Sequence, residues 1–343
     1  MNEALKRRIL PRVKKWGTLI VAFLLLFVVV GGIFSAIRFM HDTGATPGLV
    51  FRLLFDDGIP LASSGDRTNV LLLGIGGGTH EGSDLTDTMI VLSFNNKNHS
   101  AALISVPRDI WSDTLKDKIN SAYHYGEEKK KGNGMILAKA ITEDVVGMPI
   151  QYAILIDFTG FKNLIDLIGG IDVNVSQTFT DTQFPIPGKE HYSCPGDPTN
   201  ACDYETVHFD AGMRHMNGDR ALIYVRSRHA EGDEGSDFAR SRRQQEVLLA
   251  FKNKIVHPVT WLTVTRLSRL PKALDDATDT DMNIGEVLTV ARKYINIKES
   301  NIKKVAFDDL LTQAPAYLYN GLYVLVPIED WTTVQTTIAK RIE

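Results

Sequence analysis

The first apolar feature of the chain is an uninterrupted run over residues 17–37 that contains no charged side chain. A run of this length can cross a bilayer as one helix. Six Lys and Arg residues precede it and only Arg38 follows closely, so the positive-inside bias predicts a cytoplasmic N-terminus. We therefore expect residues 1–16 in the cytoplasm, a transmembrane anchor over 17–39, and an extracytoplasmic remainder at the cell membrane.

A cleavable signal peptide is the competing interpretation of this run. The run exceeds the apolar core of a typical signal peptide, and it ends in FSAIRF without a clear small-residue cleavage site. The following residues 40–68 are rich in Gly, Pro, Ser and Asp around one apolar patch, LVFRLLF. This composition predicts a linker with a single docking segment.

From Asn69 the pattern changes to short β-favouring runs. NVLLLGI, TMIVLSF and SAALISV are separated by turn residues, which predicts neighbouring strands of one sheet. GMILAKAITEDVVG and FTGFKNLIDLIGG have helical spacing, and each precedes a further predicted strand, QYAILID or IDVNV. This alternation of strands and helices predicts a layered α/β domain over residues 69–260.

The rest of the chain continues the pattern with longer irregular parts. Residues 176–205 predict a long loop that holds both cysteines, and residues 236–257 predict a strong helix. Residues 261–343 contain two helical patterns and two short strands. We expect this last part to pack on the same domain.

The net charge of the chain argues against one class of binding partner. The chain has 343 residues and is 44% hydrophobic, which is enough for a real core. Seven of its 38 basic residues and one of its 41 acidic residues precede residue 41, so the remainder carries a formal charge of −9. We therefore expect no nucleic acid partner. Cys194 and Cys202 bracket the turn-rich segment CPGDPTNAC, and an oxidising compartment would let them form a disulfide, with two free thiols as the alternative.

Arginines are concentrated in one segment of this acidic chain. Five of them fall within eighteen residues: Arg226, Arg228, Arg240, Arg242 and Arg243. A helix that begins near Ser236 would carry one stripe with a polar N-terminal end and an apolar, buried C-terminal end: Arg240, Gln244, Leu248, Phe251 and Ile255. We expect Arg243 to flank this stripe and Arg242 to be a solvated surface residue.

These arginines have two interpretations. Buried guanidinium groups need anionic partners, which a structural ion-pair network could supply from Glu231, Asp233, Glu234 and Asp237. Alternatively, Arg226 and Arg228 would point the same way from an extended segment, so that four guanidinium groups converge on a phosphorylated ligand. The segment HAEGDEGSD is typical of a mobile loop and favours the ligand.

Two strand ends add polar candidates. Asp87 stands at the entrance of a strand in LTDTMIV, and Arg108 and Asp109 follow the end of another strand in SVPRDIW. Lys118 and Asn120 in DKINSAYHYG lie near a predicted helix start. GIGGGT lacks the P-loop and dinucleotide patterns, and neither HExxH nor GxSxG occurs, so a nucleotide loop, a zinc hydrolase and a serine hydrolase have little support.

Taken in order, these motifs resemble the LytR-CpsA-Psr family of bacterial cell-envelope proteins. The resemblance spans residues 69–256 and is carried by NVLLLGI, LTDTMIV, SVPRDIW, KINSAY, FTGFKNLIDLIGGIDV, MNGDRALIYVRSR and DFARSRRQQEVL. It implies a three-layer α/β/α domain with a central mixed sheet, a hydrophobic pocket for a polyprenyl chain, and an arginine-lined mouth for its phosphate or pyrophosphate. Members transfer glycopolymers from this lipid diphosphate carrier to peptidoglycan, with Mg²⁺ assisting.

The resemblance also implies roles for individual residues. Asp87 matches the metal-associated acid, and the phosphate-holding positions match Arg108, Arg226, Arg228, Arg240 and Gln244, to which we add Lys118. Gly76 stands where the family usually has Asp, and Leu85 stands where it has Arg. We expect His80 or Asp84 to supply the missing metal ligand.

These observations predict a membrane-anchored phosphotransferase that moves a glycopolymer from a polyprenyl diphosphate to peptidoglycan. A sugar hydroxyl would attack the glycan-bound phosphorus, with Asp109 either as the base or as a salt-bridge partner of Arg108. One alternative is a polyprenyl diphosphate phosphatase that uses water at the same site. The other is a non-catalytic anchored protein that binds envelope lipid or polymer, which the departure at Gly76 favours.

Overall fold

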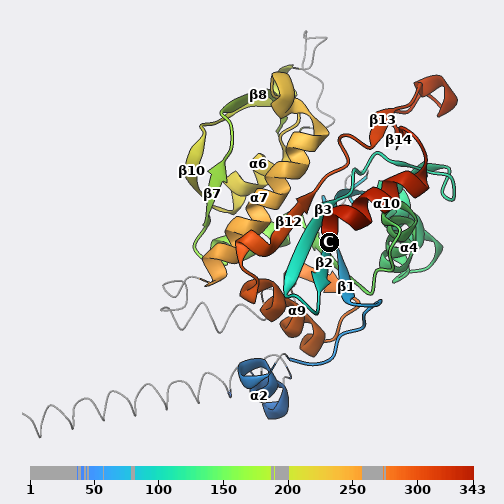
Figure 1. The fold of residues 1–343 in the computed structure, drawn as a ribbon. Coiled ribbons are helices and arrows are strands. Elements are labelled where there is room, and N and C mark those ends of the chain that lie inside the picture. Colours follow the sequence, from blue (N-terminus) through green and yellow to red (C-terminus); the bar gives the residue numbers. More distant parts are fainter. Residues whose placement is uncertain are drawn as a thin grey trace, which may run out of the picture.

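The computed structural model describes residues 46–56, 58–78, 82–186, 201–256 and 276–343, together with residues 37, 40, 41, 44, 189 and 273 (Figure 1). The predicted anchor over 17–39 lies outside these residues apart from Ile37, and it stays a prediction. In the described part of the chain, no helix combines the length and the apolar character needed to span a membrane.

A six-stranded mixed sheet forms the centre of the domain (Figure 1). Its strands lie in the order β11 (Thr278–Thr280), β6 (Tyr152–Asp157), β1 (Arg67–Ile75), β2 (Thr86–Asn95), β3 (Ser100–Ser105) and β12 (Ile302–Val305). β1, β2 and β3 are antiparallel neighbours, as the three apolar runs predicted. β6 is parallel to β1 and β12 is parallel to β3, whereas β11 is antiparallel to β6.

Helices cover both faces of this sheet. Successive side chains of a strand point to opposite faces, so Leu71 and Leu73 belong to one hydrophobic core and Val70 belongs to another. The first core is closed by α3 (Ala122–Lys129), α4 (Gly134–Val146) and α10 (Trp331–Ile342). The second is closed by α7 (Asp237–Val256) and α9 (Ile284–Asn296). The predicted α/β fold with a mixed sheet between two helical layers is confirmed.

A side lobe packs around the remaining face of α7. It consists of α5 (Phe158–Leu167), α6 (Gly218–Arg226) and two strand pairs, β7 (Ile171–Val175) with β10 (Gly212–Met216) and β8 (Phe179–Pro185) with β9 (Tyr204–Phe209). Phe179, Phe209 and Tyr224 stack in its core. The prediction of one loop over 176–205 was wrong at β8, because this strand is mostly polar and buries only a few of its side chains.

The C-terminal part completes the domain. β11 and β12 form the two edges of the central sheet, and α9 and α10 cover its opposite faces. β13 (Leu311–Gln313) and β14 (Leu325–Pro327) form a hairpin beside the short pair β4 (Trp111–Ser112) and β5 (Asp117–Lys118). Residues 276–343 therefore belong to the same layered unit as the N-terminal strands.

One helix lies within the predicted linker. α2 (Pro47–Phe55) contains the apolar patch LVFRLLF and packs against α9, below the sheet in the view of Figure 1. Thr46 caps its first turn by accepting a hydrogen bond from the Leu49 amide, and Pro47 occupies the first helical position, where the missing N–H costs nothing.

Candidate functional site

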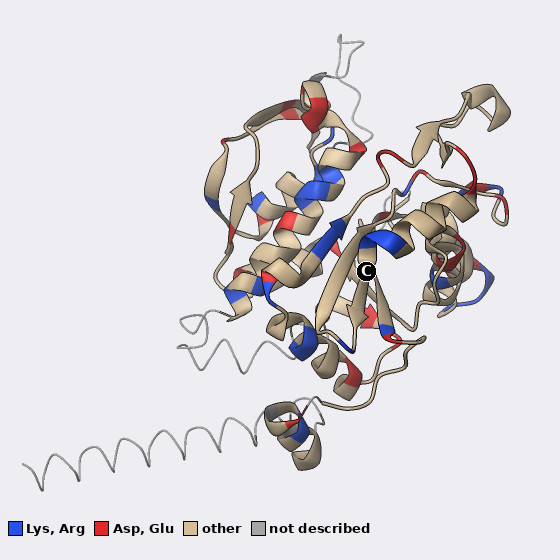
Figure 2. Ribbon diagram, in the orientation of Figure 1, with Lys and Arg blue, Asp and Glu red and all other residues tan. Residues whose placement is uncertain are grey.

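The polar candidates from distant parts of the sequence meet in one small pocket, where β2 begins and β3 ends. β2 contributes Asp87 at its start, and the turn after β3 contributes Arg108 and Asp109. The first two turns of α7 contribute the rest of its polar wall: Asp237, Arg240, Ser241 and Gln244. Figure 2 shows how basic residues gather along this half of α7. We call this the polar pocket.

Arg108 is the paired cation of the polar pocket. Its guanidinium donates to the Asp87 carboxylate, and its Nε lies 3.3 Å from Asp109 Oδ2. Burial alone would lower the pKa of Arg108, but the carboxylates of Asp87, Asp109 and Asp237 raise it above its ordinary value. Arg108 therefore stays charged, and its position is fixed before any ligand enters.

Asp109 has two cationic partners. Besides Arg108, it accepts a hydrogen bond from Lys118 Nζ on β5 at 2.6 Å, and its side chain is almost fully buried. Both oxygens of this carboxylate therefore face cations, Oδ2 toward Arg108 and Oδ1 toward Lys118. The geometry therefore favours the salt-bridge interpretation of Asp109 and gives Lys118 a place at the edge of the site.

Arg240 is the unpaired cation of the polar pocket. Its side chain is only 5% exposed, and its Nε has no hydrogen-bond partner among the described residues. The pKa of Arg240 is lowered to about 10, mainly by burial; the charges of Arg108 and Arg228 act in the same direction, and those of Asp87 and Asp237 oppose them. A buried guanidinium with an N–H group that no described residue accepts is costly, which indicates a binding site for an anion.

Arg226 and Arg228 do not point the same way. Arg226 is the last residue of α6, so the extended segment assumed from the sequence is wrong there. Its guanidinium stacks on Phe158 and Phe184, with 4.5 and 5.6 Å to the ring centroids. Arg228 turns toward α7 instead, and its Nε lies 4.0 Å from Asp237 Oδ1. Arg228 thus joins Arg108 and Arg240, whereas Arg226 lies against the apolar wall.

Arg242 and Arg243 form the structural ion-pair network. Arg243 is fully buried and donates to the Glu234 side chain at 3.0 Å and to the backbone oxygens of Tyr224 and Ser227. Arg242 contacts the other oxygen of Glu234 with a side chain that is 41% exposed, so it is a surface residue as predicted but also belongs to the ion-pair network. The loop prediction for HAEGDEGSD was wrong, because Glu234 is buried within a short 3-10 helix, Gly232–Gly235.

An apolar pocket of about 220 Å³ lies directly behind the polar pocket. It is bounded by the sheet and by α5, α6 and α7, and its lining includes Ile154, Phe161, Leu222, Val225, Val247, Leu248 and Phe251. Gln244 lines both pockets and donates to Thr88 Oγ1 at 2.9 Å. The predicted stripe on α7 therefore runs from Arg240 in the polar pocket through Gln244 to Phe251 in the apolar one.

The predicted metal ligands do not form a metal site in the described part of the chain. The Asp84 carboxylate is bonded to His124 Nδ1 at 2.7 Å, and the carboxylate of Asp87 is paired with Arg108. His80 lies outside the described residues. No group of three or more His, Cys, Asp or Glu side chains suited to a metal ion occurs among those described. The residues present thus do not fit a preformed Mg²⁺ site, and the Gly76 and Leu85 departures are consistent with this.

The structure describes only one of the two cysteines that were predicted to form a disulfide. Cys202 lies in the short 3-10 helix Ala201–Asp203 and is disulfide-bonded. Cys194 lies outside the described residues, so its part in that bond stays a prediction.

Three further residues of the site were not among those predicted from the sequence. Thr88 orients Gln244, and it stands in the same TDT motif as Asp87. Asp237 lines the polar pocket from the first turn of α7, although it had been considered only as a structural ion-pair partner. Tyr323 lies beside Lys118, whose Nζ is 6.0 Å from the ring centroid. Motif spacing could have suggested the first two, but no local signal connects Tyr323 with the site.

Both pockets lie within the part of the chain that matches a known protein family. The LytR_cpsA_psr family profile matches residues 56–340. The chain belongs to the LytR-CpsA-Psr family.

Several relatives of known name are similar to this member of the family. A Bacillus cereus protein named polyisoprenyl-teichoic acid–peptidoglycan teichoic acid transferase TagU is 28% identical over 243 residues, which cover 70% of this chain and 68% of that protein. The protein of the same name from Bacillus mycoides is 31% identical over 198 residues, covering 56% of this chain and 54% of the relative. The chain thus spans between about half and two thirds of these relatives.

Solved structures support the fold. The crystal structure of Bacillus subtilis TagV has a TM-score of 0.57 and 23% identity, and the match covers 81% of this chain and 97% of that one. A structure titled "TagT bound to LI-WTA" has a TM-score of 0.55 and 22% identity, covering 81% of this chain and 91% of the other. At these identities the likeness concerns the fold alone.

Proposed function

We propose that this protein is a membrane-anchored extracytoplasmic phosphotransferase that moves a glycopolymer from a polyprenyl diphosphate carrier to peptidoglycan. The single observation that carries the proposal is the junction at Gln244, where an apolar pocket meets a buried, unpaired Arg240. A polyprenyl diphosphate has the same two parts, an apolar tail and a dianionic or more highly charged head. The names of the TagU relatives support the same substrate class.

Each part of the donor has a matching part of the site. The tail would lie among the apolar side chains between the sheet and α5, α6 and α7. The diphosphate would bind Arg240 and Arg228 and would compete with Asp87 for Arg108. Gln244, held by Thr88, would donate to a phosphate oxygen at the boundary.

The reaction needs charge neutralisation more than covalent help from the protein. The acceptor hydroxyl forms a new bond to the phosphorus that carries the glycan, and the bridging bond to the lipid phosphate breaks. Polyprenyl monophosphate leaves with the electron pair, and the guanidinium groups of Arg108 and Arg240 stabilise the developing charge. We assign the hydroxyl proton to Asp237, since its ion-pair partner among the described residues, Arg228, is 4.0 Å away at Nε and leaves the carboxylate accessible to the acceptor.

An acceptor surface borders the polar pocket and favours transfer over hydrolysis. Leu325 of β14 donates its amide to the Asp109 carbonyl at 2.9 Å, which holds the β13–β14 hairpin beside the site. This hairpin exposes Tyr317 and Tyr323, 82% and 43% exposed, and Tyr319 packs edge-on against Trp111. Flat apolar rings with polar edges are suited to the faces of sugar rings. A phosphatase would have no use for such a surface.

Mg²⁺ remains a separate expectation within this proposal. The described residues do not supply a preformed metal site, so no step above depends on the ion.

Product analysis tests the proposal against both alternatives. The full-length protein is incubated with a polyprenyl diphosphate-linked glycan, with and without peptidoglycan fragments. A transferase yields polyprenyl monophosphate and a phosphodiester-linked conjugate only when the acceptor is present. Release of phosphoglycan without acceptor would indicate a phosphatase, and donor binding without any turnover would indicate a binding protein. Either of these two results would overturn the proposal.

A further inference from the structure

The helix in the linker exposes two phenylalanines. Phe51 and Phe55 are one turn apart on α2, their ring centroids are 4.9 Å apart, and their side chains are 63% and 74% exposed. The opposite side of the helix faces α9, where the Leu49 side chain approaches Gly285. α2 therefore has one face packed on the domain and one aromatic face without a partner among the described residues.

This aromatic face is fixed relative to the domain. Arg292 of α9 donates from Nη1 to the Arg52 carbonyl in the last turn of α2 at 3.0 Å. Just after α2, the Ile59 amide donates to Thr289 Oγ1 at 3.1 Å. Gly58 adopts a φ of +87°, and a Cβ there would lie 2.5 Å from the same Thr289 oxygen, so only glycine allows this close approach. Residues 58 and 59 are thus held against α9 by specific contacts.

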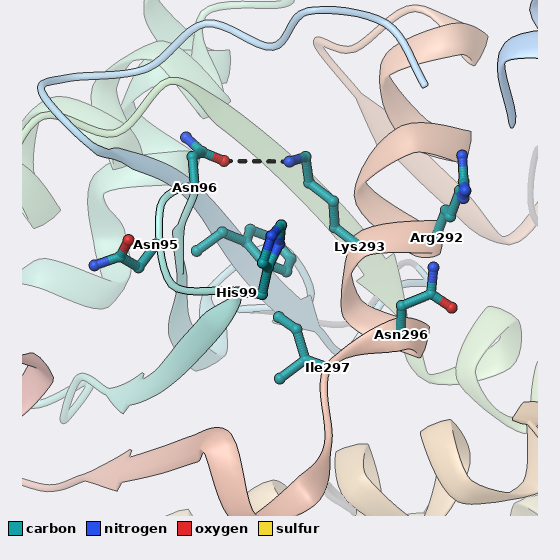
Figure 3. Close-up of a pocket in the computed structure, with 8 residues that line it drawn as sticks. Asn95, Asn96, His99, Arg292, Lys293, Asn296 and Ile297 are labelled. Atoms are coloured by element: carbon teal, nitrogen blue, oxygen red, sulfur yellow. Dashed lines mark hydrogen bonds between the residues drawn. The ribbon is translucent and has the colours of Figure 1, made fainter. Parts of the chain in front are cut away.

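A basic pocket lies beside this face, between α9 and the turn from β2 to β3 (Figure 3). It has a volume of about 120 Å³ and is lined by Phe94, Asn95, Asn96, His99, Arg292, Lys293, Asn296 and Ile297. None of these lining residues is acidic. Lys293 Nζ donates to the neutral side chain of Asn96 at 3.3 Å, so this contact leaves its charge uncompensated. Two cations and three amides suit the oxygens of a phosphate group.

The basic pocket continues toward α2. An adjoining cavity of about 450 Å³ shares Asn96 and Lys293 with it and is also lined by Arg52 and Asp56. The aromatic face and the basic pocket therefore belong to one end of the molecule, away from the polar pocket at the start of α7 (Figure 1).

The sequence indicates which partner can cover the aromatic face and the basic pocket. Seven residues separate the predicted anchor over 17–39 from Pro47, so α2 begins within about 28 Å of the end of that anchor even when the connection is fully extended. Aromatic rings and basic side chains side by side are the combination that binds a bilayer surface, the rings among the acyl chains and the cations on acidic headgroups.

We propose that α2, α9 and the β2–β3 turn form a docking face that lies on the acidic phospholipids of the membrane. Phe51 and Phe55 enter the interface, and Arg292 and Lys293 bind a lipid phosphate in the basic pocket. The inference rests on the proposed anchoring, but it adds a second, site-specific contact that a tether alone would not make.

Docking would also bring the apolar pocket to the bilayer. Tyr294 of α9 donates to the Leu248 carbonyl of α7 at 3.3 Å, and Leu248 lines the apolar pocket. The docking face is thus linked directly to the wall that would hold the polyprenyl tail. A tail that passes from the membrane into this pocket would cross little water, which is the functional reason for a fixed height above the surface.

Site-specific photocrosslinking to lipid tests the docking face. The full-length chain carries p-benzoylphenylalanine in place of Phe55 and is reconstituted into nanodiscs of phosphatidylglycerol with phosphatidylcholine. The matched control carries the same group in place of Tyr317, which is 82% exposed on the β13–β14 hairpin at the other end of the domain (Figure 1). We expect phospholipid adducts at position 55 and only background at position 317. Equal yields at the two positions, or none at 55, would overturn the proposal.

A second arm tests the basic pocket. Arg292→Gln and Lys293→Gln should each lower the adduct yield at position 55 by about fivefold in acidic nanodiscs, and both should have little effect in pure phosphatidylcholine. Lys340→Gln on α10 is the charge-matched control and should change neither. An equal loss from all three variants would show a general charge effect and refute the specific site. Turnover of a donor in detergent does not need docking, so it reports on the proposed reaction independently.

Discussion

Arg240 and Arg243 lie three residues apart on α7, yet Glu234 neutralises only Arg243. Arg243 donates to the Glu234 carboxylate and to three backbone oxygens within 3.1 Å, whereas Arg240 Nε is buried without a partner among the described residues. One helix turn thus separates a structural arginine from one that is available to a ligand. The ion-pair interpretation of the arginine cluster is thus confirmed for Arg242 and Arg243, whereas the ligand interpretation of Arg240 stays a prediction.

This contrast predicts opposite effects of two similar substitutions on stability. Arg240→Met removes an uncompensated buried charge, so it should leave the ligand-free protein unchanged or stabilise it by about 1–4 kcal/mol. Thermal and denaturant unfolding would measure this, and donor binding should be lost in the same variant. A destabilised Arg240→Met protein would show that the guanidinium has a structural partner after all.

Arg243→Met is the matched control. It leaves Glu234 buried without one of its cations and frees the carbonyls of Tyr224 and Ser227, so it should destabilise the protein by about 3–5 kcal/mol. Unfolding by urea is the measurement. A Glu234→Gln variant should also be destabilised, because Arg242 and Arg243 would then share a neutral partner.

The pH dependence of donor binding should identify Arg240. Burial lowers its pKa to about 10, so in the free protein this guanidinium loses its proton as the pH rises through that value. Donor affinity should therefore fall above about pH 10, and Arg240→Gln should bind weakly without this break. The stability effect has the opposite sign, because the unfolded chain holds this proton more tightly, so the cost of the buried charge decreases as the pH rises from about 10 toward the ordinary arginine pKa. Affinity measured between pH 8 and 11, with circular dichroism to confirm folding, separates the two effects.

The fold could be predicted where apolar periodicity was strong. β1, β2 and β3 were evident because each is a buried run bounded by turn residues. β8 was missed because its lone buried residues among polar ones have no clear period, and its partner β9 lies beyond the segment that contains Cys194. Pairing across such a distance depends on tertiary contacts that a local pattern does not contain.

The site could be predicted as a set of residues but not as a geometry. Helical spacing correctly placed Arg240 and Gln244 on one stripe of α7. It could not show that Arg226 ends a helix and stacks on Phe158, since YVRSR is compatible with helix or strand. Nor could it distinguish Arg243 from Arg240, because the difference is the position of one carboxylate, Glu234, in a 3-10 helix too short to show periodicity.

Gln244 should contribute to donor affinity at the point where the polar and apolar pockets meet. Gln244→Leu removes the donor to Thr88 and extends the apolar wall into the polar pocket. One hydrogen bond to a charged oxygen is worth about 1.5–3 kcal/mol, so donor affinity should fall by about 10- to 100-fold. Thr88→Val leaves the amide in place without its partner and should cause a smaller loss. Isothermal titration with a polyprenyl diphosphate would measure both, and equal affinity in all three proteins would remove Gln244 from the site.

The apolar pocket should determine the preference for lipid length. Val225→Trp adds bulk inside the cavity of about 220 Å³, so a long polyprenyl tail should bind more weakly than it does to the parent protein. A short-chain diphosphate, which needs only the polar pocket, should be affected much less. Val225→Ala is the control and should not reduce binding of the long chain. Competition between long and short donors gives the ratio directly, and an unchanged ratio in Val225→Trp would place the tail elsewhere.

Tyr323 should affect the affinity for the acceptor and not the affinity for the donor. Its ring is 43% exposed beside Lys118, on the hairpin that Leu325 holds against Asp109. Replacing it with alanine removes a flat surface for a sugar ring but changes no group that contacts the diphosphate in the proposed complex. Tyr323→Ala should therefore raise the acceptor concentration needed for half-maximal transfer by about 3- to 10-fold, the loss expected for one aromatic contact of about 0.5–1.5 kcal/mol. Donor affinity should stay unchanged, whereas a fall in donor affinity of the same size would assign the ring to the diphosphate site.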